Sequence, residues 1–262
     1  MLTTDAYYGH RDYRAMLSKV PEITLFFWII KVLATTVGET AADFLATNLN
    51  LGLTGTTLIM SGLLNIALVF QFRVRRYVPG IYWLAVVLIS VVGTLITDNL
   101  VDNLGVSLRV CTAVFGAAMF ATFGIWYASE KTLSIHSITT TKREGFYWLA
   151  ILFTFALGTA AGDLIAEGLN LGYGNSVLLF IVMIAPVFVA YRFLNFNAIA
   201  AFWCAYVFTR PLGASTGDLL SQAKADGGLG LGTTVTSCIF LAAILAVVVF
   251  LSKTKRDQLL VS

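Results

Sequence analysis

The chain has 262 residues, of which 58% are hydrophobic and only 12% charged, and its mean hydropathy is +0.84. Soluble domains are nearer half apolar and a quarter charged. The composition therefore excludes a soluble globular protein and indicates an integral membrane protein. The net charge of +3 is small, and nothing in the sequence suggests nucleic-acid binding.

Eight stretches are apolar and close to the length of about 20 residues that a membrane-spanning helix needs. In chain order they are 22–46, 55–72, 79–100, 108–128, 145–168, 174–192, 197–221 and 232–252. We divide the chain into a cytoplasmic arm (1–20), a first membrane half (21–129), a cytoplasmic linker (130–144), a second membrane half (145–252) and a cytoplasmic tail (253–262). The sequence thus predicts an all-α, multi-pass membrane protein with eight transmembrane helices.

The basic residues lie almost entirely on one predicted side of the membrane. Of the 17 Lys and Arg residues, 13 fall in the segments on the side of both termini, and only Arg109 and Lys224 fall on the other side. Because loops rich in Lys and Arg stay in the cytoplasm, both termini are predicted to be cytoplasmic. The remaining two, Lys31 and Arg210, fall inside predicted helices.

One pattern of three residues recurs four times: a tryptophan, a glycine ten residues later, and an aspartate five residues after that. The four sets are Trp28–Gly38–Asp43, Trp83–Gly93–Asp98, Trp148–Gly158–Asp163 and Trp203–Gly213–Asp218. They are spaced by 55, 65 and 55 residues, which groups them in pairs. Each repeat spans the membrane twice, so we expect four parallel two-helix repeats about an axis along the membrane normal, as two halves of four helices.

The chain resembles the bacterial membrane-anchored proteins built from tandem two-helix repeats of unknown function. The resemblance is carried by "KVPEI" at 19–23, "GETAADF" at 38–44 and "TRPLGASTGD" at 209–218, and it covers about residues 20–250. It implies residence in the bacterial inner membrane and the layout of four repeats. It implies no activity, so a function has to be inferred from the residues.

The repeated residues also suggest structural roles. The tryptophans lie near the predicted cytoplasmic boundary among other aromatic residues, which is typical of anchoring at the membrane interface. We expect the four glycines to allow close helix packing. Arg210 and Pro211 are followed by Gly213, and the proline is expected to kink or interrupt the seventh helix.

The repeat aspartates fall near the outer ends of the predicted helices. Asp163 is about 27 Å along its helix from the cytoplasmic start at Gly145, at 1.5 Å per residue, and the hydrocarbon core is about 30 Å thick. In three repeats a second acid lies four residues away, on the same face of a regular helix. The candidate ion-binding residues are Asp43, Asp98, Asp163, Asp218, Glu39, Asp102 and Glu167.

Oxygen is the ligand type that accompanies these acids. Both histidines, His10 and His136, are predicted to be cytoplasmic, and no cluster of Cys or Met lies near the aspartates. Oxygen ligands suit hard cations such as Mn²⁺, Mg²⁺ or Ca²⁺. The sequence therefore predicts a metal site formed by Asp43, Asp98, Asp163 and Asp218. Clustered carboxylates repel one another unless protons or cations intervene, which suggests exchange of protons for metal.

Two basic residues are candidates for gating or charge compensation. Lys31 precedes Glu39 by eight residues, and Arg210 precedes Asp218 by eight. Each base is therefore about two helical turns inward of the acid on its own helix. We expect each to reach the acids of a neighbouring helix, with the first and fourth repeats as neighbours in a closed ring.

These observations lead to one leading functional hypothesis and three alternatives. The leading hypothesis is a secondary transporter of a hard cation, most plausibly a divalent metal such as manganese, coupled to protons. The alternatives are a passive cation channel, a non-transporting membrane partner of a signalling protein, and aspartates that only form a structural network. The expected partners are membrane lipid and the transported metal ion or proton, with a homo-oligomer left open. No enzymatic motif and no covalent cofactor are expected.

Overall fold

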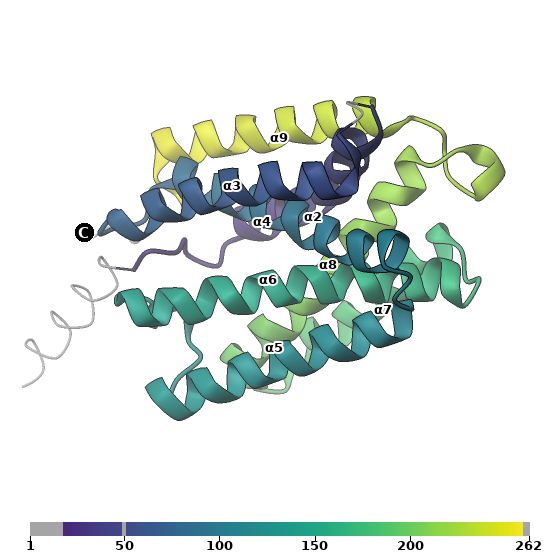
Figure 1. Ribbon diagram of the computed structural model, residues 1–262. Coiled ribbons are helices and arrows are strands. Elements are labelled where there is room, and N and C mark those ends of the chain that lie inside the picture. The colour runs from purple at the N-terminus through teal and green to yellow at the C-terminus, as the bar shows by residue number, and fades with distance from the viewer. Residues whose placement is uncertain (1–17, 49–50, 259–262) are drawn as a thin grey trace, which may run out of the picture.

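The computed structural model describes residues 18–48 and 51–258. The predicted arm, except for its last three residues, and the last four residues of the predicted tail lie outside the described residues. The described part contains eight long helices (Figure 1). They are α2 (Leu25–Asp43), α3 (Gly52–Arg73), α4 (Pro79–Asp98), α5 (Leu108–Glu130), α6 (Thr141–Asp163), α7 (Tyr173–Phe193), α8 (Ala198–Ser221) and α9 (Thr233–Thr254). The prediction of an all-α protein with eight helices is confirmed.

Seven of the eight described helices are long and apolar enough to cross a membrane. The remaining helix, α8, carries Arg210, Pro211 and Asp218, all of them buried. It continues as one helix through Pro211, so the interruption that the proline led us to expect is absent. The polar residues of α8 face other helices instead of lipid, which allows a less apolar helix to stay inside the bundle.

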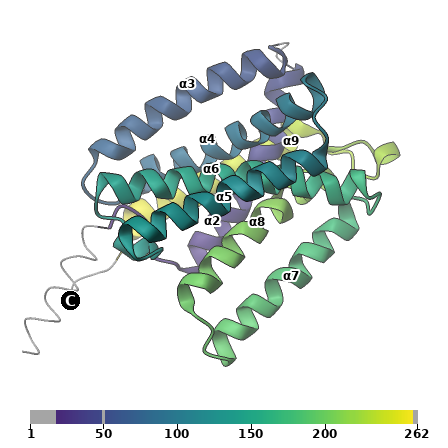
Figure 2. The same cartoon turned by 60° about the horizontal axis from the view of Figure 1, so that its bottom comes forward.

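The first helix of each repeat lies inside the bundle and the second lies outside. The inner helices α2, α4, α6 and α8 form a closed ring, because α2 packs on α4, α4 on α6, α6 on α8, and α8 again on α2. The spans of α2, α4 and α6 are 56–67% buried, whereas those of the outer helices α3, α5, α7 and α9 are only 11–22% buried. Figure 2 shows α3 and α7 on opposite sides of the bundle.

Each outer helix packs on the inner helix of the following repeat. Thus α3 packs on α4, α5 on α6 and α7 on α8, while the last helix, α9, packs back on α2. The fourth repeat therefore contacts the first in the same way as the others contact their successors. This cyclic order gives the bundle a central pseudo-fourfold axis, around which equivalent residues of the four repeats lie in common layers.

The tryptophans form an aromatic layer of this ring. In each repeat, the aromatic residue before the tryptophan packs on the tryptophan of the next repeat. The four pairs, with distances between ring centroids, are Phe27–Trp83 (5.6 Å), Tyr82–Trp148 (5.6 Å), Tyr147–Trp203 (6.2 Å) and Phe202–Trp28 (5.8 Å). Trp83, Trp148 and Trp203 are only 2–6% exposed. The expectation of interfacial anchoring is therefore wrong for these three tryptophans, which are part of the core.

The repeat glycines bring neighbouring inner helices into contact. A methyl group on Gly38 would overlap Ser90, and one on Gly93 would overlap Phe155. Gly158 in the same way faces Arg210, and Gly213 faces Thr35, which closes the ring. The predicted role of the four glycines in close helix packing is confirmed.

The described parts of the predicted arm, linker and tail pack on the end of the bundle that carries the aromatic layer, which is the predicted cytoplasmic end. Lys19 Nζ donates hydrogen bonds to Glu144 Oε2 at 2.6 Å and to the carbonyl of Phe72 at 3.1 Å. The hydroxyl of Tyr77 donates to Asp257 Oδ2 at 2.5 Å. These contacts hold the described parts of the arm and the tail against this end of the bundle.

An ion pair on this end predicts a pH-dependent contribution to stability. His136 Nδ1 lies 3.4 Å from Glu22 Oε1, and hydrogen bonding to Glu22 raises the pKa of His136 above its ordinary value. The stabilisation is therefore complete below about pH 6.5 and is lost as the pH rises through the folded-state pKa. We expect His136→Gln to lower the free energy of unfolding at about pH 5.5, by less than about 1 kcal/mol for this partly exposed pair, but not at about pH 8.5. Thermal unfolding at the two pH values measures the difference. An equal loss at both pH values would contradict this assignment.

Candidate ion-binding site

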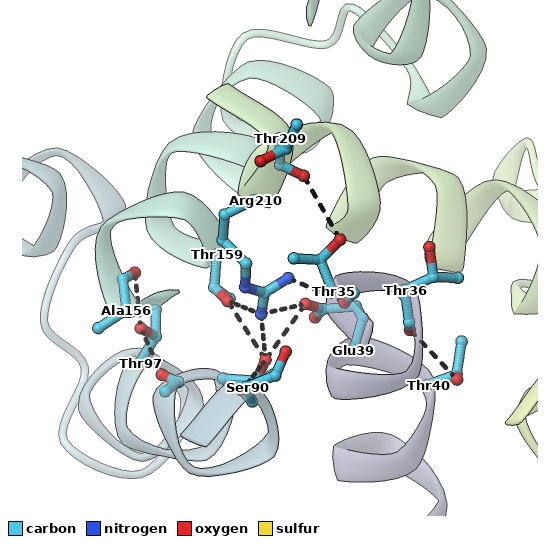
Figure 3. Close-up of polar contacts among 12 residues, drawn as sticks. Thr35, Thr36, Glu39, Thr40, Ser90, Thr97, Ala156, Thr159, Thr209 and Arg210 are labelled. Atoms are coloured by element: carbon cyan, nitrogen blue, oxygen red, sulfur yellow. Dashed lines mark hydrogen bonds and ion pairs between the residues drawn. The ribbon is translucent and has the colours of Figure 1, made fainter. Parts of the chain in front are cut away.

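A buried arginine lies at the centre of the ring. The side chain of Arg210, on α8, is fully buried. Its Nη2 donates to Glu39 Oε2 at 3.1 Å, to Thr159 Oγ1 at 2.6 Å and to Thr94 Oγ1, and its Nη1 donates to the carbonyl of Thr35 at 3.3 Å (Figure 3). As its position eight residues before Asp218 led us to expect, Arg210 reaches an acid of a neighbouring helix.

The three side chains that Arg210 Nη2 binds are equivalent in the repeats. Glu39, Thr94 and Thr159 each lie eleven residues after the tryptophan of their repeat. The fourth equivalent residue is Ala214, on the helix of Arg210 itself. One side chain of the fourth repeat therefore binds the same position in the other three. Sequence reasoning missed Thr94 and Thr159, although their register with Glu39 was a usable signal.

Three carboxylates come together beside this arginine. Oxygen atoms of Glu39, Asp163 and Asp218 all lie within 4.8 Å of one another, and we refer to these three residues as the acid group. Glu39 and Asp218 are 5% and 6% exposed, and Asp163 is half-buried. Glu39 belongs to the acid group and also pairs with Arg210. The acid group joins the first, third and fourth repeats.

The other predicted acids lie near this group but outside it, within the described residues. Asp43 is half-buried and accepts a hydrogen bond of 3.5 Å from Gln222. Asp98 is also half-buried, whereas Asp102 and Glu167 are exposed. Glu167 accepts a hydrogen bond of 2.8 Å from the hydroxyl of Tyr173.

A change of helix type follows three of the four repeat aspartates. Asp43, Asp98 and Asp163 each end an α-helix, and a π-helical turn follows at Phe44–Asn48, Asn99–Asn103 and Leu164–Gly168. Such wider turns are rare and frequent at functional sites. Asp102 and Glu167 lie within these turns, so the spacing of a regular α-helix does not apply to them.

Lys31 binds no acid in residues 18–48 and 51–258. Its side chain is fully buried, and its Nζ has no hydrogen-bond partner among the described residues. It lies 4.4 Å from the ring centroid of Phe155 and 4.2 Å from that of Tyr206. The expectation that Lys31 would reach the acids of a neighbouring helix is therefore wrong, because two aromatic rings surround the amine.

The acid group offers oxygen atoms and a negative formal charge. With three ionised carboxylates and one guanidinium, the charge is −2, since the −3 of Glu39, Asp163 and Asp218 is offset by the +1 of Arg210. This charge matches a divalent cation, and oxygen ligands suit a hard one. The residues present therefore fit a metal such as Mn²⁺, Mg²⁺ or Ca²⁺.

The fold and the site define a class: a polytopic helical membrane protein of four two-helix repeats in a closed ring, with an acidic group buried between the inner helices. The chain belongs to the family described as Repeat of Unknown Function (DUF347), which matches it four times, at residues 26–77, 81–132, 146–195 and 201–257. These matches confirm the four tandem repeats. No curated protein and no solved structure matches the chain significantly.

Proposed function

We propose that the protein is a secondary transporter of a hard divalent cation such as Mn²⁺, coupled to protons, in which the acid group binds the transported ion. The observation that carries the proposal is the convergence of Glu39, Asp163 and Asp218 within 4.8 Å inside a membrane protein. Ionisable residues within membrane helices commonly mark ion pathways. We place the protein in the bacterial inner membrane with both termini in the cytoplasm, and the proposal involves no enzymatic step.

Arg210 has a direct role in this proposal, as a cation that belongs to the protein. Its guanidinium pairs with Glu39 at 3.1 Å. A metal ion that binds Asp163 and Asp218 competes for the same Glu39 carboxylate. Glu39 is thus shared between an internal cation and the transported one, and this exchange is the step that links ion binding to a rearrangement of the ring.

The half-buried aspartates supply the approach to the acid group. Asp43 and Asp98 lie at the same position of their repeats as Asp163 and Asp218. Their partial exposure gives a cation a first contact before it reaches the buried carboxylates. Asp102 and Glu167, which are exposed, add negative charge at the same end of the bundle and attract cations to it.

The closed layers favour a carrier over a passive channel. On the predicted cytoplasmic side of Arg210, the axis is filled by Lys31, Tyr206 and the aromatic layer, and Tyr82 and Tyr147 are fully buried there. A continuous ion path would need these side chains to move in every open state. A carrier needs such closure on one side at a time.

Uptake of Mn²⁺ into proteoliposomes tests the proposal. The full-length protein is expected to give saturable uptake, accompanied by a pH change that a dye inside the vesicles records. We expect Asp163→Asn to lower uptake by about 10-fold or more, because it removes one of three charged ligands. Asp226→Asn is the matched control, since Asp226 is exposed in the short turn Lys224–Asp226, and it is expected to transport like the wild type.

The alternatives give different results in the same experiment. Unchanged uptake in Asp163→Asn contradicts the binding assignment. Large, non-saturating currents with weak pH coupling identify a passive channel. A wild-type protein that moves no ion, but loses stability when an aspartate is neutralised, identifies a non-transporting membrane partner.

A further inference from the structure

Lys31 is a buried amine that takes no part in the metal binding proposed for the acid group. Its Nζ contacts two aromatic rings and has no hydrogen-bond acceptor among the described residues. Aromatic faces attract an ammonium ion, but they leave its three N–H donors without an oxygen acceptor. Whether an amine held in this way keeps its proton therefore depends on the other charges nearby.

Packing alone does not explain a lysine at this position. The equivalent residues, three after each tryptophan, are Lys31, Val86, Ile151 and Tyr206. Val86 and Ile151 are fully buried in the same layer. Two corners of this layer are thus filled by aliphatic side chains of ordinary size, and an aliphatic residue at the first corner would avoid the cost of burying an amine.

Lys31 shares its part of the bundle with a second cation, Arg210. From the aromatic layer to the layer of Glu39, the inner helices carry the following charged or titratable groups: Tyr206, Arg210 and Cys204 of α8, Tyr82 of α4, Tyr147 of α6 and Glu39 of α2. The outer helix α9, which also packs on α2, has no charged residue before Lys253. Glu39 is the first carboxylate that these two cations meet, and oxygen atoms of Asp163 and Asp218 lie within 4.8 Å of it.

The two cations also share one aromatic ring. Arg210 Cζ lies 5.4 Å from the ring centroid of Phe155, and Lys31 Nζ lies 4.4 Å from the same centroid. Glu39, which pairs with Arg210, lies about 12 Å along the helix from Lys31 at 1.5 Å per residue. A metal ion bound to Glu39 would add two positive charges to this buried region and would engage the carboxylate that pairs with Arg210.

We propose that Lys31 is the group that releases a proton when the acid group takes up a divalent cation. This inference rests on the proposed function. In the step, an N–H bond of the Lys31 ammonium breaks, the electron pair stays on Nζ, and the proton leaves to solvent as the cation binds the carboxylates. Because such linkage is reciprocal, protonation of Lys31 weakens cation binding by the same factor by which the cation promotes proton release.

Calorimetric titration of the purified full-length protein with Mn²⁺ tests this linkage. Titrations in buffers of different ionisation enthalpy give the number of protons released per Mn²⁺, and titrations at several pH values give the pH dependence of Kd. We expect Lys31→Met to release about one proton fewer per Mn²⁺ and to flatten the slope of log Kd against pH by about one. Ile151→Met is the matched control in the same layer and is expected to match the wild type.

A second variant covers the case in which Lys31→Met fails to fold. Lys31→Arg keeps a positive charge that is never released. We therefore expect it to release about one proton fewer per Mn²⁺ than the wild type, and to bind Mn²⁺ more weakly at each pH at which the wild type releases that proton. If the wild type binds Mn²⁺ and either folded variant releases as many protons as it does, the inference about Lys31 is overturned while the proposed function stands. A wild type that binds no Mn²⁺ overturns both.

Discussion

Replacing Arg210 by methionine is expected to lower the free energy of unfolding by about 3–5 kcal/mol, because it leaves Glu39 as a buried carboxylate without its charged partner. The guanidinium is fully buried, and its Nη2 binds side chains of three other inner helices. The loss is therefore expected to loosen the whole ring. Unfolding of the purified protein in detergent, followed by loss of helical signal, measures the effect.

A double-mutant cycle measures the interaction energy between Arg210 and Glu39 separately from the other contacts of Arg210. Glu39→Gln removes the charge that Arg210→Met leaves unpaired, so the double variant is expected to recover much of the stability that Arg210→Met loses. If instead the two losses simply add, the pair at 3.1 Å makes no energetic contribution. The conclusion that Glu39 is shared between Arg210 and the acid group would then have to be abandoned.

Gly158→Val is expected to have the second-largest effect, a loss of about 3 kcal/mol from overpacking. The new Cβ would overlap the side chain of Arg210 and contact the ring of Pro211 at 3.1 Å, where α6 and α8 approach closely. Gly124→Val is the matched control on the outer helix α5, since nothing lies within 4 Å of the equivalent Cβ position there.

The two glycine variants are compared by their unfolding temperatures in the same detergent. Valine has a better helix propensity than glycine, so Gly124→Val is expected to be neutral or slightly stabilising. Similar losses in both variants would show that the substitution acts through the helix itself. Close contact between α6 and α8 at Gly158 would then not be the reason for the glycine.

The sequence by itself determined the repeat architecture. The spacing of Trp28, Gly38 and Asp43 recurs three more times, and apolar composition over about 20 residues specifies a membrane helix almost without regard to its neighbours. For the same reason the eight helices were predicted close to their observed bounds. The position of Arg210 relative to Asp218 also correctly indicated that it reaches an acid on another helix, because helix geometry fixes the height of a side chain along the bundle.

Only the tertiary structure decided which side chains face one another. A tryptophan at the membrane interface and one in a helical core have similar apolar surroundings in the sequence, so the burial of Trp83, Trp148 and Trp203 followed from the closed ring alone. The π-helical turns have no comparable sequence signal, and Asp102 and Glu167, which lie within them, are outside the acid group.

The tertiary structure likewise decided the environment of the two buried bases. Height along a helix does not determine direction around it, and direction depends on the order in which the inner helices neighbour one another. That order places Arg210 against Glu39, and it places Lys31 between Phe155 and Tyr206. Long-range packing, which a local pattern of residues does not encode, therefore made one base an ion-pair partner and left the other without an acceptor in the described part of the chain.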